Sequence, residues 1–115
     1  MEEKRDARQR RGEVMGEFVA VADASSLAPG EGRTVHIKGR EFALYNVEGK
    51  FYAMDDQCPH KGGPLGAGIL DQGKIVCPLH GWAFDPESGQ CDLRADKVVK
   101  TYPTRVRDGQ VEICI

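Results

Sequence analysis

The sequence predicts an all-β protein, arranged as a sandwich or barrel of short strands with almost no helix. Runs of β-branched and aromatic residues are brief, and turns rich in glycine or proline separate them along the chain. In the run 34–38, Val35 and Ile37 alternate with polar neighbours, which is the period of a strand with one buried face. Many short strands with regular turn signals are typical of antiparallel sandwiches and barrels.

Recognisable turns bound the individual strands. Glu48-Gly49 and Asp108-Gly109 each separate two apolar runs by two residues, a spacing that favours a hairpin. Pro103 interrupts the longer of the last two runs and predicts an edge or a bulge there. One helical turn is expected at 22–27. The expected strands are 18–21, 34–38, 42–47, 50–54, 74–76, 98–107 and 110–115.

Length and charge describe an ordinary single domain. At 115 residues and a net charge of −2, the chain lacks the charge excess of a protein that binds nucleic acid or a membrane surface. Residues 1–15 are polar and predict a flexible extension, which leaves 16–115 for the folded domain. No apolar run approaches the roughly eighteen residues of a membrane span, and the N-terminus has no signal-peptide core. A soluble, cytoplasmic protein is therefore expected.

Two short runs carry the chemistry of the chain: Cys58-Pro59-His60 and Cys77-Pro78-Leu79-His80. They give Cys-x-His, then sixteen residues, then Cys-x-x-His. Two thiolates and two imidazoles suit a [2Fe–2S] cluster in which histidines replace cysteines on one iron. The segment 61–66 between the runs is rich in glycine, so its backbone can approach inorganic sulfides closely.

Structural zinc is the rival interpretation of the same four residues, because Cys and His are also its ligands. Zinc sites usually space paired ligands by two to four residues, whereas Cys58 and His60 leave only one residue between them. A structural zinc module or a metal-free interaction module is therefore kept as an alternative of another class.

The residues after the second run add Gly81-Trp82-x-Phe84-Asp85 and then Ser88-Gly89. With the two Cys/His runs, these motifs resemble the soluble members of the Rieske iron–sulfur family, over roughly residues 18–115. The resemblance implies one Rieske-type [2Fe–2S] cluster, held in a small subdomain at roughly 57–85 that is inserted into a β basal domain.

The resemblance also implies a role for each ligand. Cys58 and Cys77 would bind the buried iron. His60 and His80 would bind the outer iron and expose their imidazole edges as the exit for electrons.

Five further residues are expected around these ligands. Backbone N–H groups near Lys61, Gly62, Gly81 and Trp82 would donate hydrogen bonds to the sulfurs and tune the potential. Pro64 would belong to a loop that shields the cluster. The side chain of Trp82 would pack under the ligand loop or contact an electron partner.

A [2Fe–2S] cluster alone takes and gives a single electron, and the sequence has no flavin or nucleotide motif. The expected function is a soluble ferredoxin that carries electrons from a flavin-containing reductase to a terminal oxygenase or reductase, and is not an enzyme by itself. The segments 77–91 and 101–106 also resemble the small subunit of NADH-dependent nitrite reductase, which is the alternative.

The resemblance further implies a low reduction potential. High-potential relatives carry a disulfide across the ligand loops, where this chain has Gly63 and Leu79. They also carry two hydroxyl donors to the sulfurs, where this chain has Trp82 and Phe84. We therefore expect a potential near the low end of the family range of about −150 to +300 mV, and flat across neutral pH.

The other polar and sulfur-bearing residues have ordinary interpretations. Cys91 and Cys114 are expected to pack in the interior without forming a disulfide. His36 is expected on the surface of a strand. Asp55 and Asp56 precede the first ligand run and are expected to cap a turn, with partner docking as the alternative.

Overall fold

The computed structural model describes residues 16–60, 62–79 and 81–115, so the expected extension 1–15 lies outside the described residues. Among these residues the regular elements are ten strands and two short 3₁₀ turns, which confirms the all-β prediction. No helix in the described part of the chain is long and apolar enough to cross a membrane. In chain order the elements are β1 (Phe18–Asp23), η1 (Ala24–Ser26), β2 (Gly32–Ile37), β3 (Arg40–Val47), β4 (Lys50–Asp55), η2 (Leu65–Ala67), β5 (Ile69–Asp71), β6 (Lys74–Val76), β7 (Ala83–Phe84), β8 (Thr101–Tyr102), β9 (Thr104–Arg107) and β10 (Gln110–Cys114).

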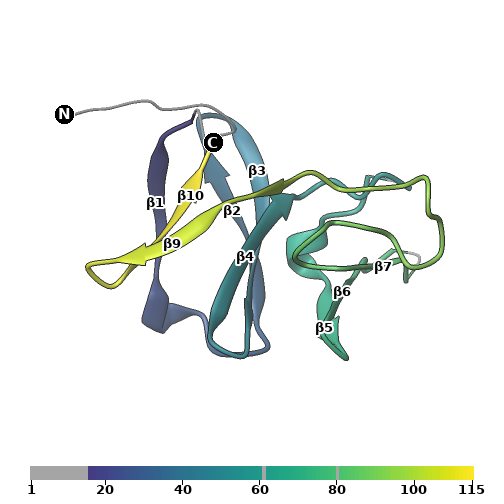
Figure 1. Cartoon of the computed structure of the whole chain (residues 1–115), viewed down its shortest axis with the longest axis horizontal. Coiled ribbons are helices and arrows are strands. Elements are labelled where there is room, and N and C mark those ends of the chain that lie inside the picture. Colours follow the sequence, from purple (N-terminus) through teal and green to yellow (C-terminus); the bar gives the residue numbers. More distant parts are fainter. Residues whose placement is uncertain (1–15, 61, 80) are drawn as a thin grey trace.

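The strands form three antiparallel sheets. Two of them, in the orders β1-β10-β9 and β2-β3-β4-β8, make the larger body of the molecule (Figure 1). The third sheet, β5-β6-β7, lies to one side of this body, next to η2 (Figure 1).

Two separate apolar cores hold these layers together. The sandwich core lies between the two larger sheets and consists of Leu27, Val35, Ile37, Phe42, Leu44, Phe51, Ala53, Tyr102, Val111 and Ile113. The insert core joins β3 and β4 to the third sheet and consists of Ala43, Tyr45, Met54, Cys58, Leu65, Ile75, Cys77, Phe84, Cys91 and Val99. Residues alternate between the two cores along β3, because successive side chains of a strand point to opposite faces.

Four hairpins share one turn chemistry. In each, a non-glycine residue at positive φ precedes a glycine at positive φ, as a two-residue type I′ turn requires. Two of them are the expected hairpins at Glu48-Gly49 and Asp108-Gly109. Lys38-Gly39 and Gln72-Gly73 are the other two.

The expected strand 98–107 is wrong as a single element. The chain forms β8 in the four-stranded sheet, passes Pro103, and continues as β9 in the other larger sheet. Proline has no backbone N–H for a ladder, and here its carbonyl accepts a 2.9 Å hydrogen bond from the Cys114 N–H. Pro103 therefore marks the point where the chain changes sheets, and β8 and β9 are both edge strands, as expected of a proline-containing segment.

The segment between β4 and β8, residues 56–100, forms the insert that contains both Cys/His runs. The third sheet and η2 lie within the expected subdomain at 57–85, and the following residues pack back on it. Phe84 pairs with Cys91, and Gln90 pairs with Val98.

Candidate metal centre

The first ligand run lies on a closed loop between β4 and η2. The Cys58 N–H donates to the Gly63 carbonyl at 2.9 Å, and the Gly62 N–H donates back to the Cys58 carbonyl at 2.8 Å. Gly62 has φ of 77°, a conformation that residues with a Cβ rarely adopt. A glycine is therefore required where this loop reverses direction.

The second ligand run repeats this construction between β6 and β7. The Cys77 N–H donates to the Trp82 carbonyl at 2.8 Å, and the Gly81 N–H donates to the Cys77 carbonyl at 3.1 Å. Gly81 has φ of 75°. In both loops the cysteine N–H is bonded five residues ahead and its carbonyl four residues ahead, so the two cysteines have matching backbone settings.

The N–H groups of Gly62 and Gly81 each close a turn onto a cysteine carbonyl, and the expected hydrogen bonds from the amides of this region to the sulfurs stay a prediction. Pro64 is exposed and precedes η2, so its shielding role stays a prediction. Lys61 lies outside the described residues.

The described ligand candidates differ in burial. Cys58 and Cys77 are 1% and 3% exposed and both belong to the insert core. His60 is half-buried, with its Nδ1 atom inside the protein. His80 lies outside the described residues. The assignment of the cysteines to an inner iron and the histidines to an outer iron stays a prediction.

The donor set of two cysteines and two histidines fits a two-iron cluster in which the histidines hold one of the irons. A single structural zinc needs four ligands around one point, whereas two irons are held by separate pairs. A Cβ at Gly63 would lie 2.9 Å from the Cys77 Sγ, so a glycine keeps the space beside this sulfur open.

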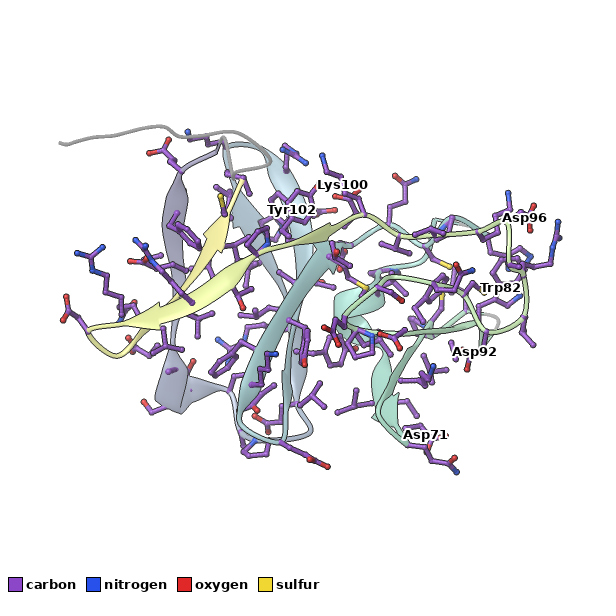
Figure 2. The ribbon with its side chains drawn as sticks, viewed as in Figure 1. Asp71, Trp82, Asp92, Asp96, Lys100 and Tyr102 are labelled. Atoms are coloured by element: carbon purple, nitrogen blue, oxygen red, sulfur yellow. The ribbon has the colours of Figure 1, made fainter. Side chains whose placement is uncertain are left out.

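Trp82 packs against the insert core, which agrees with the expected packing under the ligand loops. Its ring also stacks on the His60 imidazole, with 4.0 Å between ring centroids and 5° between planes. Figure 2 shows Trp82 at the end of the molecule away from β1.

Two buried residues that sequence reasoning did not assign to the site fasten the insert to the sandwich. Asp56 is 4% exposed, and its Oδ1 accepts hydrogen bonds from the Gly66 N–H at 2.8 Å and the Thr34 hydroxyl at 2.9 Å. The Tyr45 hydroxyl donates to the Leu65 carbonyl at 2.7 Å. Burial, together with the charge of Asp56, raises the pKa of Tyr45 to about 12.

Lys74, Asp85 and Asp92 form one group of charged side chains on the insert. Lys74 lies 3.1 Å from Asp92 and 3.8 Å from Asp85, and the hydrogen bond to Asp92 raises its pKa. The backbone N–H groups of Ser88 and Glu87 donate to the Asp85 carboxylate and, with Lys74, lower its pKa.

The expectations for Cys91, Cys114 and His36 are met. Cys91 and Cys114 are buried free thiols, and burial raises the pKa of Cys114. His36 is exposed beside Glu41. The expected turn caps at Asp55 and Asp56 are wrong. Asp55 lies in β4 and accepts a 2.7 Å hydrogen bond from the Tyr102 hydroxyl, whereas Asp56 bonds the distant Gly66 and Thr34.

A β sandwich with an insert of two matching loops, each with a Cys and a His in its sequence, defines the chain as an iron–sulfur domain. The family model for the Rieske [2Fe-2S] domain matches residues 17–103. The chain therefore belongs to the Rieske [2Fe–2S] family, whose cofactor is a [2Fe–2S] cluster.

Relatives in this family include small electron carriers. The ferredoxin component of the naphthalene 1,2-dioxygenase system of Pseudomonas putida is 36% identical over 98 residues, covering 84% of this chain and 91% of that protein. A chain in the complex of oxygenase and ferredoxin of carbazole 1,9a-dioxygenase is 32% identical, with a TM-score of 0.78 and coverage of 84% and 92%.

A second group of neighbours consists of chains assigned as small subunits of nitrite reductase. A provisionally assigned NADH-dependent nitrite reductase small subunit from Mycobacterium tuberculosis is 25% identical, with a TM-score of 0.81. The match covers 88% of this chain and 96% of that one.

Proposed function

We propose that this protein is a soluble one-electron carrier of the cytoplasm, which passes electrons from a flavin-containing reductase to a terminal oxygenase. The observation that carries the proposal is the pair of matching ligand loops, with two buried cysteines and a half-buried histidine. The small oxygenase-system ferredoxins support it, because the chain spans 91% of such a relative.

In this proposal Cys58 and Cys77 hold the inner iron, and His60 and His80 hold the outer iron. When bound, a [2Fe–2S] cluster accepts and releases one electron. The insert core around the two cysteines keeps water from their sulfurs. The half-buried His60 is partly accessible at the surface, so a partner protein can come close to the proposed outer iron.

The small subunit of NADH-dependent nitrite reductase is the second candidate, supported by the neighbour with a TM-score of 0.81. A mobile carrier purifies alone from its native host, whereas a fixed subunit is recovered with a large flavin- and haem-containing partner. Size-exclusion chromatography of the native protein distinguishes these outcomes.

The cofactor assignment is tested on the purified protein. We expect about two irons and two acid-labile sulfides per chain, a red-brown colour and a Rieske-type EPR signal on reduction. The substitution His80→Ser should abolish that signal, and Cys91→Ser should leave it unchanged because Cys91 is proposed to bind no iron. Persistence of the signal in His80→Ser, or zinc in place of iron, would contradict the proposed ligand set.

The absent disulfide and hydroxyl donors support a low potential. Gly63, Leu79, Trp82 and Phe84 occupy the four positions. Voltammetry should give about −150 to −50 mV, with no slope around neutral pH. A clearly positive potential would contradict this part of the proposal while leaving the cofactor assignment intact.

A further inference from the structure

The backbone of Trp82 belongs to the second ligand loop. Its carbonyl accepts a 2.8 Å hydrogen bond from the Cys77 N–H, the bond that closes this loop. The residue lies two positions before Phe84, which is fully buried in the insert core. Trp82 is therefore anchored at its backbone to the loop that carries Cys77 and, in sequence, His80.

The ring of Trp82 reaches across to the first ligand loop. It stacks on the His60 imidazole at 4.0 Å and 5°, which is nearly parallel. Within the described residues, this is the ring contact that joins the two loops. The indole is partly buried and packs against the insert core.

The loops approach each other closely at a second point, without a covalent link. A Cβ built on Gly63 would lie 2.9 Å from the Cγ of Leu79. Neither residue is a cysteine, so no disulfide forms across this contact. Apart from the proposed metal ligands, the loops are therefore held together by non-covalent contacts, and the stacked rings of His60 and Trp82 are one of them.

We propose that Trp82 is a positioning residue. Its ring contact with His60 links the two ligand loops and holds the His60 imidazole in one plane for metal binding. The inference rests on the ligand set of the proposed function. The terminal torsion of histidine is broad, so an imidazole without a flat neighbour can take many orientations. A parallel indole removes that freedom, and because its backbone lies in the other loop, it also resists separation of the loops.

The test compares Trp82→Ala, Trp82→Leu and Trp82→Phe in the full-length holoprotein. Loss of visible colour in excess chelator reports opening of the loops, and the EPR line width with histidine nitrogen couplings reports imidazole orientation. We expect Trp82→Ala and Trp82→Leu to lose colour about two- to tenfold faster than wild type, with broadened spectra. Trp82→Phe keeps a flat ring and should stay within about twofold of wild type.

Leu93→Ala is the matched control, because Leu93 is a large apolar residue of the insert that is 65% exposed and takes no part in the stack. The proposed role of Trp82 is wrong if Trp82→Ala and Trp82→Leu both lose colour at the wild-type rate and both give the wild-type EPR spectrum. Equal acceleration in the Leu and Phe variants would also overturn that role, because the flat ring would then be irrelevant. If Trp82→Ala does not fold, the Leu and Phe variants still decide. Absence of a Rieske signal from the wild type would instead contradict the ligand set.

Discussion

The sandwich core and the insert core differ in what holds them together. The sandwich core consists, apart from Leu27, of strand residues packed between two sheets, whose ladders contain one register shift in β1. The insert core packs one face of β3 and β4 against loops and three short strands, and single polar contacts such as those of Asp56 and Tyr45 fix its position. The stability of the sandwich therefore comes from the total apolar volume that it buries, whereas the position of the metal-binding insert depends on individual hydrogen bonds.

The largest expected effect belongs to the sandwich core. Leu44 is fully buried there, and Leu44→Ala would leave a cavity that destabilises the protein by about 3 kcal/mol. Thermal unfolding followed by circular dichroism measures the loss. Val106→Ala, at a residue that is 52% exposed, is the control and should change stability by less than about 0.5 kcal/mol. A small effect of Leu44→Ala would mean that the sandwich repacks freely.

In the insert, one methyl group should matter almost as much. A Cβ on Gly68 would collide with the backbone oxygen of Val76, an atom that cannot rotate away. Gly68→Ala should therefore cost about 2–3 kcal/mol and reduce iron content, since η2 and β6 must separate. Metal analysis and thermal unfolding measure both effects. Ala67→Ser at the exposed neighbouring position should behave as wild type. If Gly68→Ala keeps wild-type stability and iron content, the backbone of the insert can shift to accommodate the methyl group.

Removing one hydroxyl tests the polar contacts themselves. Tyr45→Phe keeps the ring but deletes the hydrogen bond to the Leu65 carbonyl, with an expected loss of about 1 kcal/mol. The pKa of Tyr45 is raised from 10.0 to about 12, so its stabilisation is complete below pH 10 and is lost as pH rises toward 12. Denaturant unfolding should show this alkaline loss in wild type and a smaller one in the variant. If the free energy of unfolding falls equally with rising pH in wild type and in Tyr45→Phe, groups other than Tyr45 cause the alkaline loss of stability.

The smallest effect concerns the surface of the insert. Asp85 has a lowered pKa, because the N–H groups of Ser88 and Glu87 and the charge of Lys74 favour its ionised form. Its contribution is present above the ordinary value of 3.8 and is lost as pH falls through the lowered value. Because the side chain is 39% exposed, Asp85→Asn should cost only a few tenths of a kcal/mol at pH 7. The difference from wild type should shrink at pH 3, and a growing difference would reverse the assigned sign.

Sequence reasoning succeeded where the signal is local. Alternation of Val35, His36 and Ile37 predicted which side of the strand is buried, and the residue pair Asp108-Gly109 predicted its hairpin. The Cys/His runs were found because their ligand chemistry and spacing are unusual.

It failed where the outcome depends on residues distant in sequence. Asp55 and Asp56 read alike, yet one is half-buried beside Tyr102 and the other is buried between Gly66 and Thr34. The change of sheet at Pro103 follows from which edge each half of the segment meets, and no local pattern encodes that choice. The stack of Trp82 on His60 joins two loops and has no signature within either one.

The strand β3 has one further consequence. Phe42 and Leu44 face the sandwich core while Ala43 and Tyr45 face the insert core, so a single strand is a wall of both compartments. If heat unfolds either core, β3 loses the packing on one of its faces and exposes apolar side chains there. The two compartments should therefore unfold together, in one calorimetric transition, although their interiors are built differently.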